Sequence, residues 1–173
     1  REKSARELAE LMVGQTLITP SRAQKPASEV ALKVDNLSVA SMNPFGTTLK
    51  GVTFEVRKGE VLGIGGVAGN GQDELLLALS GEIRAPATAI RVADTPVGAL
   101  GPSARRRIGL LAAPEERLGH AAAPDMSLTE NALLTGLIRE NLATRGFLDW
   151  GKARTFAERI IKGFDVRTPG PEH

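Results

Sequence analysis

A glycine-rich segment between residues 63 and 71 is the part of the sequence best suited to chemistry. It runs Gly-Ile-Gly-Gly-Val-Ala-Gly-Asn-Gly and precedes an apolar stretch typical of a helix. Glycines let the backbone turn tightly and aim successive N–H groups at one point, and a helix N-terminus adds partial positive charge. The segment therefore predicts a concave nest of N–H groups for the phosphates of a nucleotide.

The spacing fits the P-loop template G-x-x-x-x-G-K-[ST] in its glycines but not in its last two positions. Gly66 and Gly71 occupy the glycine positions, whereas Gln72 stands at the lysine position and Asp73 at the Ser/Thr position. We favour this alignment. The candidate nucleotide-binding residues are Gly66, Gly69, Asn70, Gly71, Gln72 and Asp73.

Two alternatives remain for the same loop. Gly63, Gly65 and Ala68 fit the dinucleotide fingerprint G-x-G-x-x-G/A, which would indicate a nicotinamide-dependent oxidoreductase. That template is expected to have an acidic strand end about 20 residues on, and here Asp94 falls in a turn. The other alternative is a tight strand–helix turn that binds nothing.

Composition excludes several other classes of site. The 173 residues include no cysteine and only two histidines, His120 and His173, so thiol chemistry is excluded and a multi-histidine metal site is not expected. The net charge is +2, and the densest basic run, Arg105–Arg107, is typical of a solvated face or of pairing with nearby acids. With few aromatic residues as well, we expect no nucleic-acid partner. Apolar runs stay far below the ~18 residues of a membrane span.

The elements before the loop indicate a joining segment followed by a sheet. Apolar residues spaced for a short helix fall at 4–12, and a polar stretch with two prolines at 15–28 predicts a linker, so we place a boundary near Glu29. Alternation then predicts strands at 30–39, with an irregularity, and at 52–56. Such alternation is typical of an antiparallel layer.

Short apolar runs on either side of the helix that follows the glycine loop predict strands that differ from those of the antiparallel layer. Val61–Ile64 and Ile108–Ala112 have no polar face, which favours strands buried on both sides, as in a parallel sheet. Between them we expect a helix from Asp73 that ends at Gly81, a weak hairpin at 89–97 and a short basic helix from Pro102.

Two further helices are predicted near the C-terminal end. Ser127 and Glu130 have the spacing of a capping box. The helix that follows is expected to turn its leucines and isoleucine inward, at Leu133, Leu134, Leu137, Ile138 and Leu142. Asp149 is expected to cap a last helix that ends at Gly163.

Taken together, these motifs resemble a known family. Residues 49–75, Leu-Lys-Gly-Val-Thr-Phe-Glu-Val-Arg-Lys-Gly-Glu-Val-Leu followed by the glycine loop and Gln-Asp-Glu-Leu, resemble the ATP-binding subunits of ABC transporters. The chain is most similar to the second nucleotide-binding domain of the two-domain ATPases of sugar and nucleoside importers. Pro114-Glu-Glu-Arg117, Gly119 and Ser127-Leu-Thr-Glu-Asn131 match the family's Q-loop region, and the helix at 4–12 looks like its interdomain segment. The resemblance covers about residues 3–168.

The resemblance implies a fold and a setting. The fold would be α/β: residues 1–29 join a preceding domain, and residues 30–173 form an incomplete ABC-type P-loop domain whose helical subdomain begins near 126. The cofactors would be ATP and Mg²⁺. The partners would be the transmembrane permease subunits, contacted through 115–131, and the other nucleotide-binding domain. The subunit would lie at the cytoplasmic face of the cell membrane.

Departures from the family pattern predict weak or absent ATP binding and no ATPase activity in this chain. Gln72 carries no charge for the β- and γ-phosphates, and Asp73 is a candidate Mg²⁺ ligand that also repels phosphate. Glu115 stands at the Q-loop position and adds negative charge. No signature loop, Walker B strand or switch histidine is found in the sequence, and the family would place them after Pro169. A non-catalytic structural or dimerisation module is therefore the main alternative function.

Overall fold

The computed structural model describes residues 7–8, 11–12, 14 and 28–173. Of the predicted joining helix at 4–12, only residues 7–8 and 11–12 are described, and they are helical. The predicted linker at 15–28 lies almost entirely outside the described residues.

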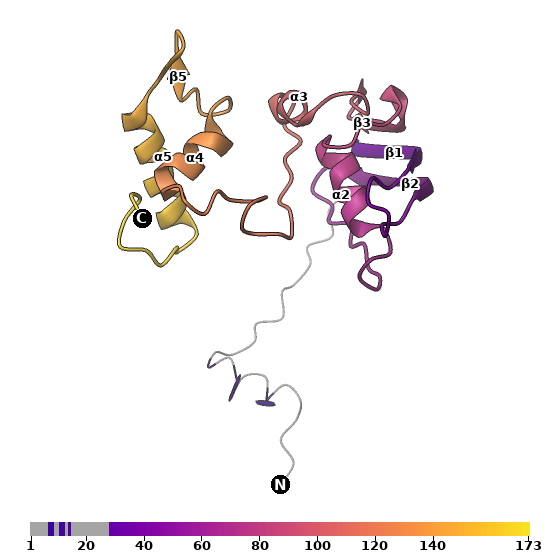
Figure 1. Ribbon diagram of the computed structural model, residues 1–173, viewed down its shortest axis with the longest axis horizontal. Coiled ribbons are helices and arrows are strands. Elements are labelled where there is room, and N and C mark those ends of the chain that lie inside the picture. Colours follow the sequence, from indigo (N-terminus) through magenta and orange to yellow (C-terminus); the bar gives the residue numbers. More distant parts are fainter. Residues whose placement is uncertain (1–6, 9–10, 13, 15–27) are drawn as a thin grey trace.

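An antiparallel sheet forms the first part of the fold, as the alternation predicts. β1 (Val30–Val39) pairs with β2 (Leu49–Arg57) on one side and with β3 (Ile90–Val92) on the other, and β3 pairs with β4 (Thr95–Pro96). The spatial order is β2-β1-β3-β4, and Figure 1 labels the first three of these strands. The predicted hairpin at 89–97 is thus confirmed as β3 and β4, preceded by a single 3-10 turn, η1 (Ala87–Ala89).

The irregularity expected in β1 is confirmed, and one of the three register shifts lies between two fully buried residues. The register with β2 shifts between Val34 and Leu37, and Asn36 has a positive φ of 49°. Asparagine tolerates this left-handed conformation better than most residues. The extra residue lets both Val34 and Leu37 face the same core, where each apolar side chain contributes about 1.5–3 kcal/mol relative to exposure.

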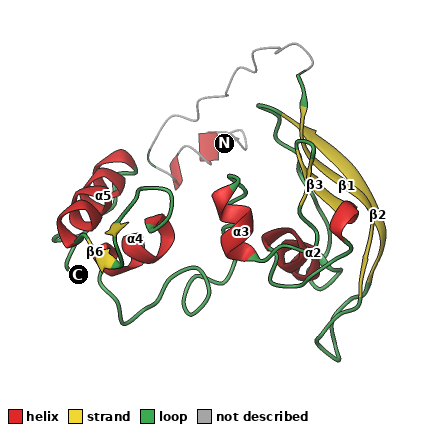
Figure 2. Cartoon of the chain, turned by 90° about the horizontal axis from the view of Figure 1, so that it is seen from above, coloured by secondary structure: helices red, strands yellow, loops and turns green. Residues whose placement is uncertain are grey.

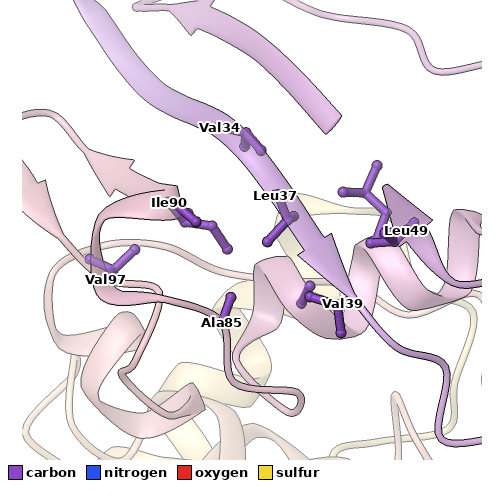
Figure 3. Packing of buried hydrophobic residues seen from close by; sticks show 10 residues of the cluster. Val34, Leu37, Val39, Leu49, Ala85, Ile90 and Val97 are labelled. Atoms are coloured by element: carbon purple, nitrogen blue, oxygen red, sulfur yellow. The ribbon is translucent and has the colours of Figure 1, made fainter. Parts of the chain in front are cut away.

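The main core lies between this sheet and helix α2 (Gln72–Ser80), as Figures 1 and 2 show. α2 ends at Gly81, which has a φ of 90°, as the glycine stop predicts. The buried members of the core, several of them visible in Figure 3, are Val34, Leu37, Val39, Leu49, Leu75, Ala78, Ala85, Ala89, Ile90 and Val97.

The two predicted parallel strands are wrong. Residues 61–64 and 108–112 form no strand, and their apolar side chains are exposed, Val61 by 92% and Leu111 by 50%. A strand buried on both faces needs ladder partners for its N–H and C=O groups. Every strand pair in the described sheets is antiparallel and none includes these residues, so they remain loops.

A helical lobe follows the basic helix α3 (Pro102–Arg107). It contains α4 (Leu128–Gly136), a small hairpin of β5 (Ala143–Thr144) and β6 (Phe147–Leu148), and α5 (Trp150–Gly163). Figure 1 shows this lobe set apart from the sheet and α2. It has its own small core, made of Leu133, Leu142, Ala153 and the partly buried Phe156.

Both predicted helix starts in this lobe are confirmed. Ser127 Oγ accepts from the Glu130 N–H at 3.2 Å, Glu130 Oε2 accepts from the Ser127 N–H at 2.7 Å, and Asp149 caps α5 through the Lys152 N–H. The predicted inward face of α4 is only partly right. Leu133 and Leu142 are buried, whereas Leu134, within the helix, and Leu137 and Ile138, just after its end at Gly136, are 56%, 38% and 42% exposed.

The described part of the chain is a mixed α/β structure with two cores. None of its helices is long and apolar enough to cross a bilayer.

Candidate functional site

The glycine loop 63–71 enters α2 through residues that need to be glycine. Gly69 and Gly71 have φ values of 86° and 100°, which L side chains rarely adopt, and a Cβ on Gly71 would lie 3.1 Å from Leu49 Cδ2. Gly63 and Gly65 have no positive φ, and added Cβ atoms there would meet nothing within 4 Å. The backbone therefore requires glycine at the end of the segment nearest α2 and not at the first two fingerprint positions.

The side chain of Gln72 folds back onto the loop. Its Oε1 accepts from the Asn70 N–H at 3.0 Å, and its Nε2 donates to the Val67 carbonyl oxygen, also at 3.0 Å. A Cβ on Gly66 would lie 2.7 Å from that Nε2. The Gln72 carboxamide thus bridges two backbone positions of the loop. Its oxygen and nitrogen atoms, which would otherwise be available to a ligand, are used in these hydrogen bonds.

Glu74, on the first turn of α2, ties the loop to the β1–β2 turn. Its buried Oε1 accepts from the Thr47 N–H at 2.9 Å and from Ser41 Oγ at 3.0 Å. Thr47 Oγ1 in turn donates to the Gly69 carbonyl oxygen at 2.8 Å. Hydrogen bonds from the Glu74 and Thr47 backbone N–H groups lower the pKa of the Glu74 carboxyl below its usual range. The sequence gives no signal for this anchor, because its parts lie 27 to 33 positions apart.

The N-terminus of α2 carries no side-chain cap. Its N-cap residue is Gly71, and the first helical hydrogen bond runs from the Leu75 N–H to the Gly71 carbonyl oxygen at 2.9 Å. Asp73 is exposed beside it and supplies acidic charge to the first turn. The helix end therefore keeps the partial positive charge that attracts anions, partly offset by this carboxylate and by that of Glu74, the other acidic residue of the first turn.

Asp73 and Glu115 line the same cavity, which has a volume of about 640 Å³. The other lining residues are Leu77, Glu116 and His120, and His120 Nε2 lies 3.0 Å from Glu82 Oε2. The fold thus brings the loop and the Q-loop-like segment together. Three carboxylates line this cavity and no lysine or arginine does, an electrostatic setting that disfavours phosphate. Among the described residues, no group of three or more acidic or histidine side chains is arranged to hold a metal ion.

Arg105 is the residue that sequence reasoning placed wrongly. Its side chain is fully buried, whereas the run Arg105–Arg107 predicts a solvated face or pairing with acids. The guanidinium donates only to carbonyl oxygens, those of Ala78, Leu79, Gly98 and Leu100, at 2.5 to 3.0 Å. Burial, together with nearby Arg84, lowers the pKa of Arg105. No sequence pattern marks such backbone partners in advance.

Asn131 organises the segment before α4. Its Nδ2 donates to the carbonyl oxygens of Ala123, Met126 and Ser127, and its Oδ1 accepts from the Ala123 N–H at 2.8 Å. The end of the predicted contact segment 115–131 is therefore a hydrogen-bonded turn fixed to the capped start of α4.

The chain is similar to known ATP-binding proteins along nearly all of its length. The chain is 30% identical to the nucleoside import ATP-binding protein NupA of Lactococcus lactis subsp. cremoris and 32% identical to the guanosine import ATP-binding protein NupO of Bacillus subtilis, over 98% of this chain and 33% of each relative. It is 33% identical to the ribose import ATP-binding protein RbsA 1 of Rubrobacter xylanophilus, over 96% of this chain and 32% of that protein. The chain is homologous to the ATP-binding proteins of ABC importers.

This homology confirms the resemblance inferred from the glycine loop and the Q-loop-like segment. The match falls on the second nucleotide-binding half, and the chain spans about a third of the length of these relatives. No family model matches the chain. No solved structure matches it either.

Proposed function

We propose that this chain is part of the ATP-binding subunit of an ABC importer for a sugar or a nucleoside, and that its P-loop is degenerate. The observation that carries the proposal is the glycine requirement at Gly69 and Gly71, directly before an uncapped helix N-terminus. That combination keeps the N–H groups and helix charge suited to phosphate. The relatives described above are ATP-binding proteins for nucleoside, guanosine and ribose import, and they supply the proposed substrate classes.

The proposed nucleotide is ATP with Mg²⁺, held weakly. The candidate residues are Gly66, Gly69, Asn70, Gly71, Gln72 and Asp73, with Glu115 at the Q-loop position. Mg²⁺ is usually bound by one or two carboxylates together with substrate phosphates, and Asp73 is the carboxylate placed for that. Without a lysine, and with three carboxylates lining the cavity, the affinity is expected to be weaker than ~100 μM. A low-micromolar dissociation constant in calorimetry would contradict this.

We expect the chain to release no phosphate from ATP. In P-loop enzymes a lysine and metal ions neutralise charge on the transferred phosphoryl group, and here Gln72 carries no charge. The assay is phosphate release by the purified chain against a Gly71→Asp variant, which adds a strained, negatively charged side chain to the loop. If the original chain releases phosphate and the Gly71→Asp variant does not, the proposal of a degenerate site is refuted.

The proposed partners are the permease subunits and the other nucleotide-binding domain, which would place the protein at the cytoplasmic face of the cell membrane. The segment 115–131 is the proposed permease contact, because it is exposed over most of its length and Asn131 fixes its end. A cross-linker placed at Arg117 in the assembled transporter should capture a permease subunit. The same cross-linker at Thr88, on η1, is the control and should not.

A non-catalytic structural module is the second candidate. The observation that favours it is the closed geometry of Gln72, whose carboxamide is engaged by Val67 and Asn70. Complete absence of ATP binding at millimolar concentration would favour this candidate. A nicotinamide-binding domain is disfavoured, since Gly63 and Gly65 have neither the conformation nor the close contacts that require glycine.

A further inference from the structure

A second cavity, of about 560 Å³, lies away from the glycine loop between α3 and the helical lobe. Its α3 wall contributes Ser103 and Arg106, and Leu111 comes from the loop after α3. Residues of α4, of α5 and of the segments that follow these two helices form the rest. Figure 2 shows α3 between α2 and α4. The volume falls within the ~300–1,000 Å³ typical of small-molecule sites.

The walls of this cavity are mainly apolar and accessible. Leu111, Leu134 and Phe164 line it and are 50%, 56% and 80% exposed. Leu137 and Ile138, which the sequence predicted to face inward, line it as well. Covering these side chains would remove apolar surface from water, so the cavity favours a ligand with an apolar body.

The cavity has more unpaired positive than negative side chains, which favours the binding of an anion. Arg106 and Arg139 line it, and neither makes an ion pair or a side-chain hydrogen bond to any residue in the described ranges. The acidic lining residue, Glu140, is already paired, since its Oε2 lies 2.6 Å from Nη2 of Arg159. Two guanidinium groups therefore remain for a ligand, and a guanidinium fork matches a carboxylate geometrically.

We propose that this cavity binds a small amphipathic carboxylate, with an aliphatic or aryl body against the leucines and its acid group on Arg106 and Arg139. A second copy of the chain is the alternative occupant, and the test below distinguishes it. The inference does not depend on whether the glycine loop binds ATP.

Calorimetric titration with decanoate tests the proposal, with decyltrimethylammonium as the probe of equal length and opposite charge. Saturable decanoate binding is expected, and Arg106→Gln and Arg139→Gln should each weaken it by about fivefold or more, because each removes a charge-assisted hydrogen bond. Arg107→Gln is the matched control: Arg107 is exposed and adjacent but does not line the cavity, so binding should not change.

Three results would overturn the proposal. Equal binding of the cationic probe would show that only apolar contact matters. Unchanged decanoate affinity in both Arg106→Gln and Arg139→Gln would place the carboxylate elsewhere. A dimer in light scattering that Leu134→Glu converts to a monomer would assign the cavity to a second copy of the chain.

Discussion

Arg105 Nη1 donates a 2.5 Å hydrogen bond to the carbonyl oxygen of Ala78, on the last turn of α2. The same nitrogen reaches the Leu79 carbonyl at 2.7 Å, and Nη2 reaches the Gly98 carbonyl at 2.8 Å. A buried cation thus satisfies the carbonyl groups that the end of a helix leaves unpaired, where the helix dipole is negative. The end of α2 is held to the loop before α3 in this way.

Replacing Arg105 with methionine should therefore destabilise the fold by roughly 3 kcal/mol or more, because several buried carbonyl groups lose their donor. Urea denaturation followed by circular dichroism measures the change. Arg107→Met is the control, since that side chain is exposed and its loss should cost less than ~0.5 kcal/mol. Equal stability of the two variants would show that the buried guanidinium contributes nothing.

Glu74 predicts a pH dependence of stability. Its pKa lies below the usual value in the folded state, so the folded protein favours the carboxylate. The stability that it contributes is present above the unfolded pKa of about 4.3 and is lost as the pH falls through the lower folded pKa. In Glu74→Gln the free energy of unfolding should fall less steeply between about pH 5 and pH 3 than in the original chain. An equal slope in Glu74→Gln and in the original chain would contradict this prediction.

The glycine requirement in the loop is testable by a matched pair of alanine variants. Gly71→Ala should destabilise the chain by about 1–3 kcal/mol, because φ is 100° there and the new Cβ meets Leu49. Gly65→Ala meets nothing within 4 Å and should change stability by less than ~1 kcal/mol. Thermal melts decide between them, and a larger loss at Gly65 than at Gly71 would argue against the P-loop alignment.

Removing the capping box at the start of α4 should cause a local loss of stability. Ser127→Ala removes the acceptor of the Glu130 N–H and should cost about 0.5–2 kcal/mol. Hydrogen exchange should show faster exchange in the first turn of α4, with little change in α2. Thr155→Ala is the control, because it removes a hydroxyl from an exposed turn of α5 that is not a helix cap. Unchanged exchange at Glu130 in Ser127→Ala would mean that the cap does not hold the helix end.

The features that could be predicted from the sequence are those fixed within a few residues. The Ser127–Glu130 capping box, the Gly81 stop and the alternation of β2 all depend on near neighbours, and all are confirmed. The strand predicted at Val61–Ile64 is wrong because an apolar run becomes a strand only beside a partner, which a local pattern does not reveal.

Within the candidate site, side-chain orientations could not be predicted from the sequence. The spacing singled out Gly71 and Gln72, yet the return of the Gln72 carboxamide to Val67 depends on the closed path of the loop. Arg105 was missed for a related reason: its acceptors are backbone carbonyl groups from segments 5 to 27 positions away, which carry no residue-type signal.

The most direct test of the central claim is calorimetric titration of ATP-Mg²⁺ into the chain and into the double variant Gln72→Lys with Asp73→Ser. The variant restores a positive charge and a hydroxyl, removes a carboxylate, and frees the loop from the carboxamide that closes it. If the glycine loop is a degenerate P-loop, the original chain binds more weakly than ~100 μM and the variant binds at least about tenfold more tightly. Equal affinity, or no binding by either protein, would contradict the account of this loop as a phosphate nest.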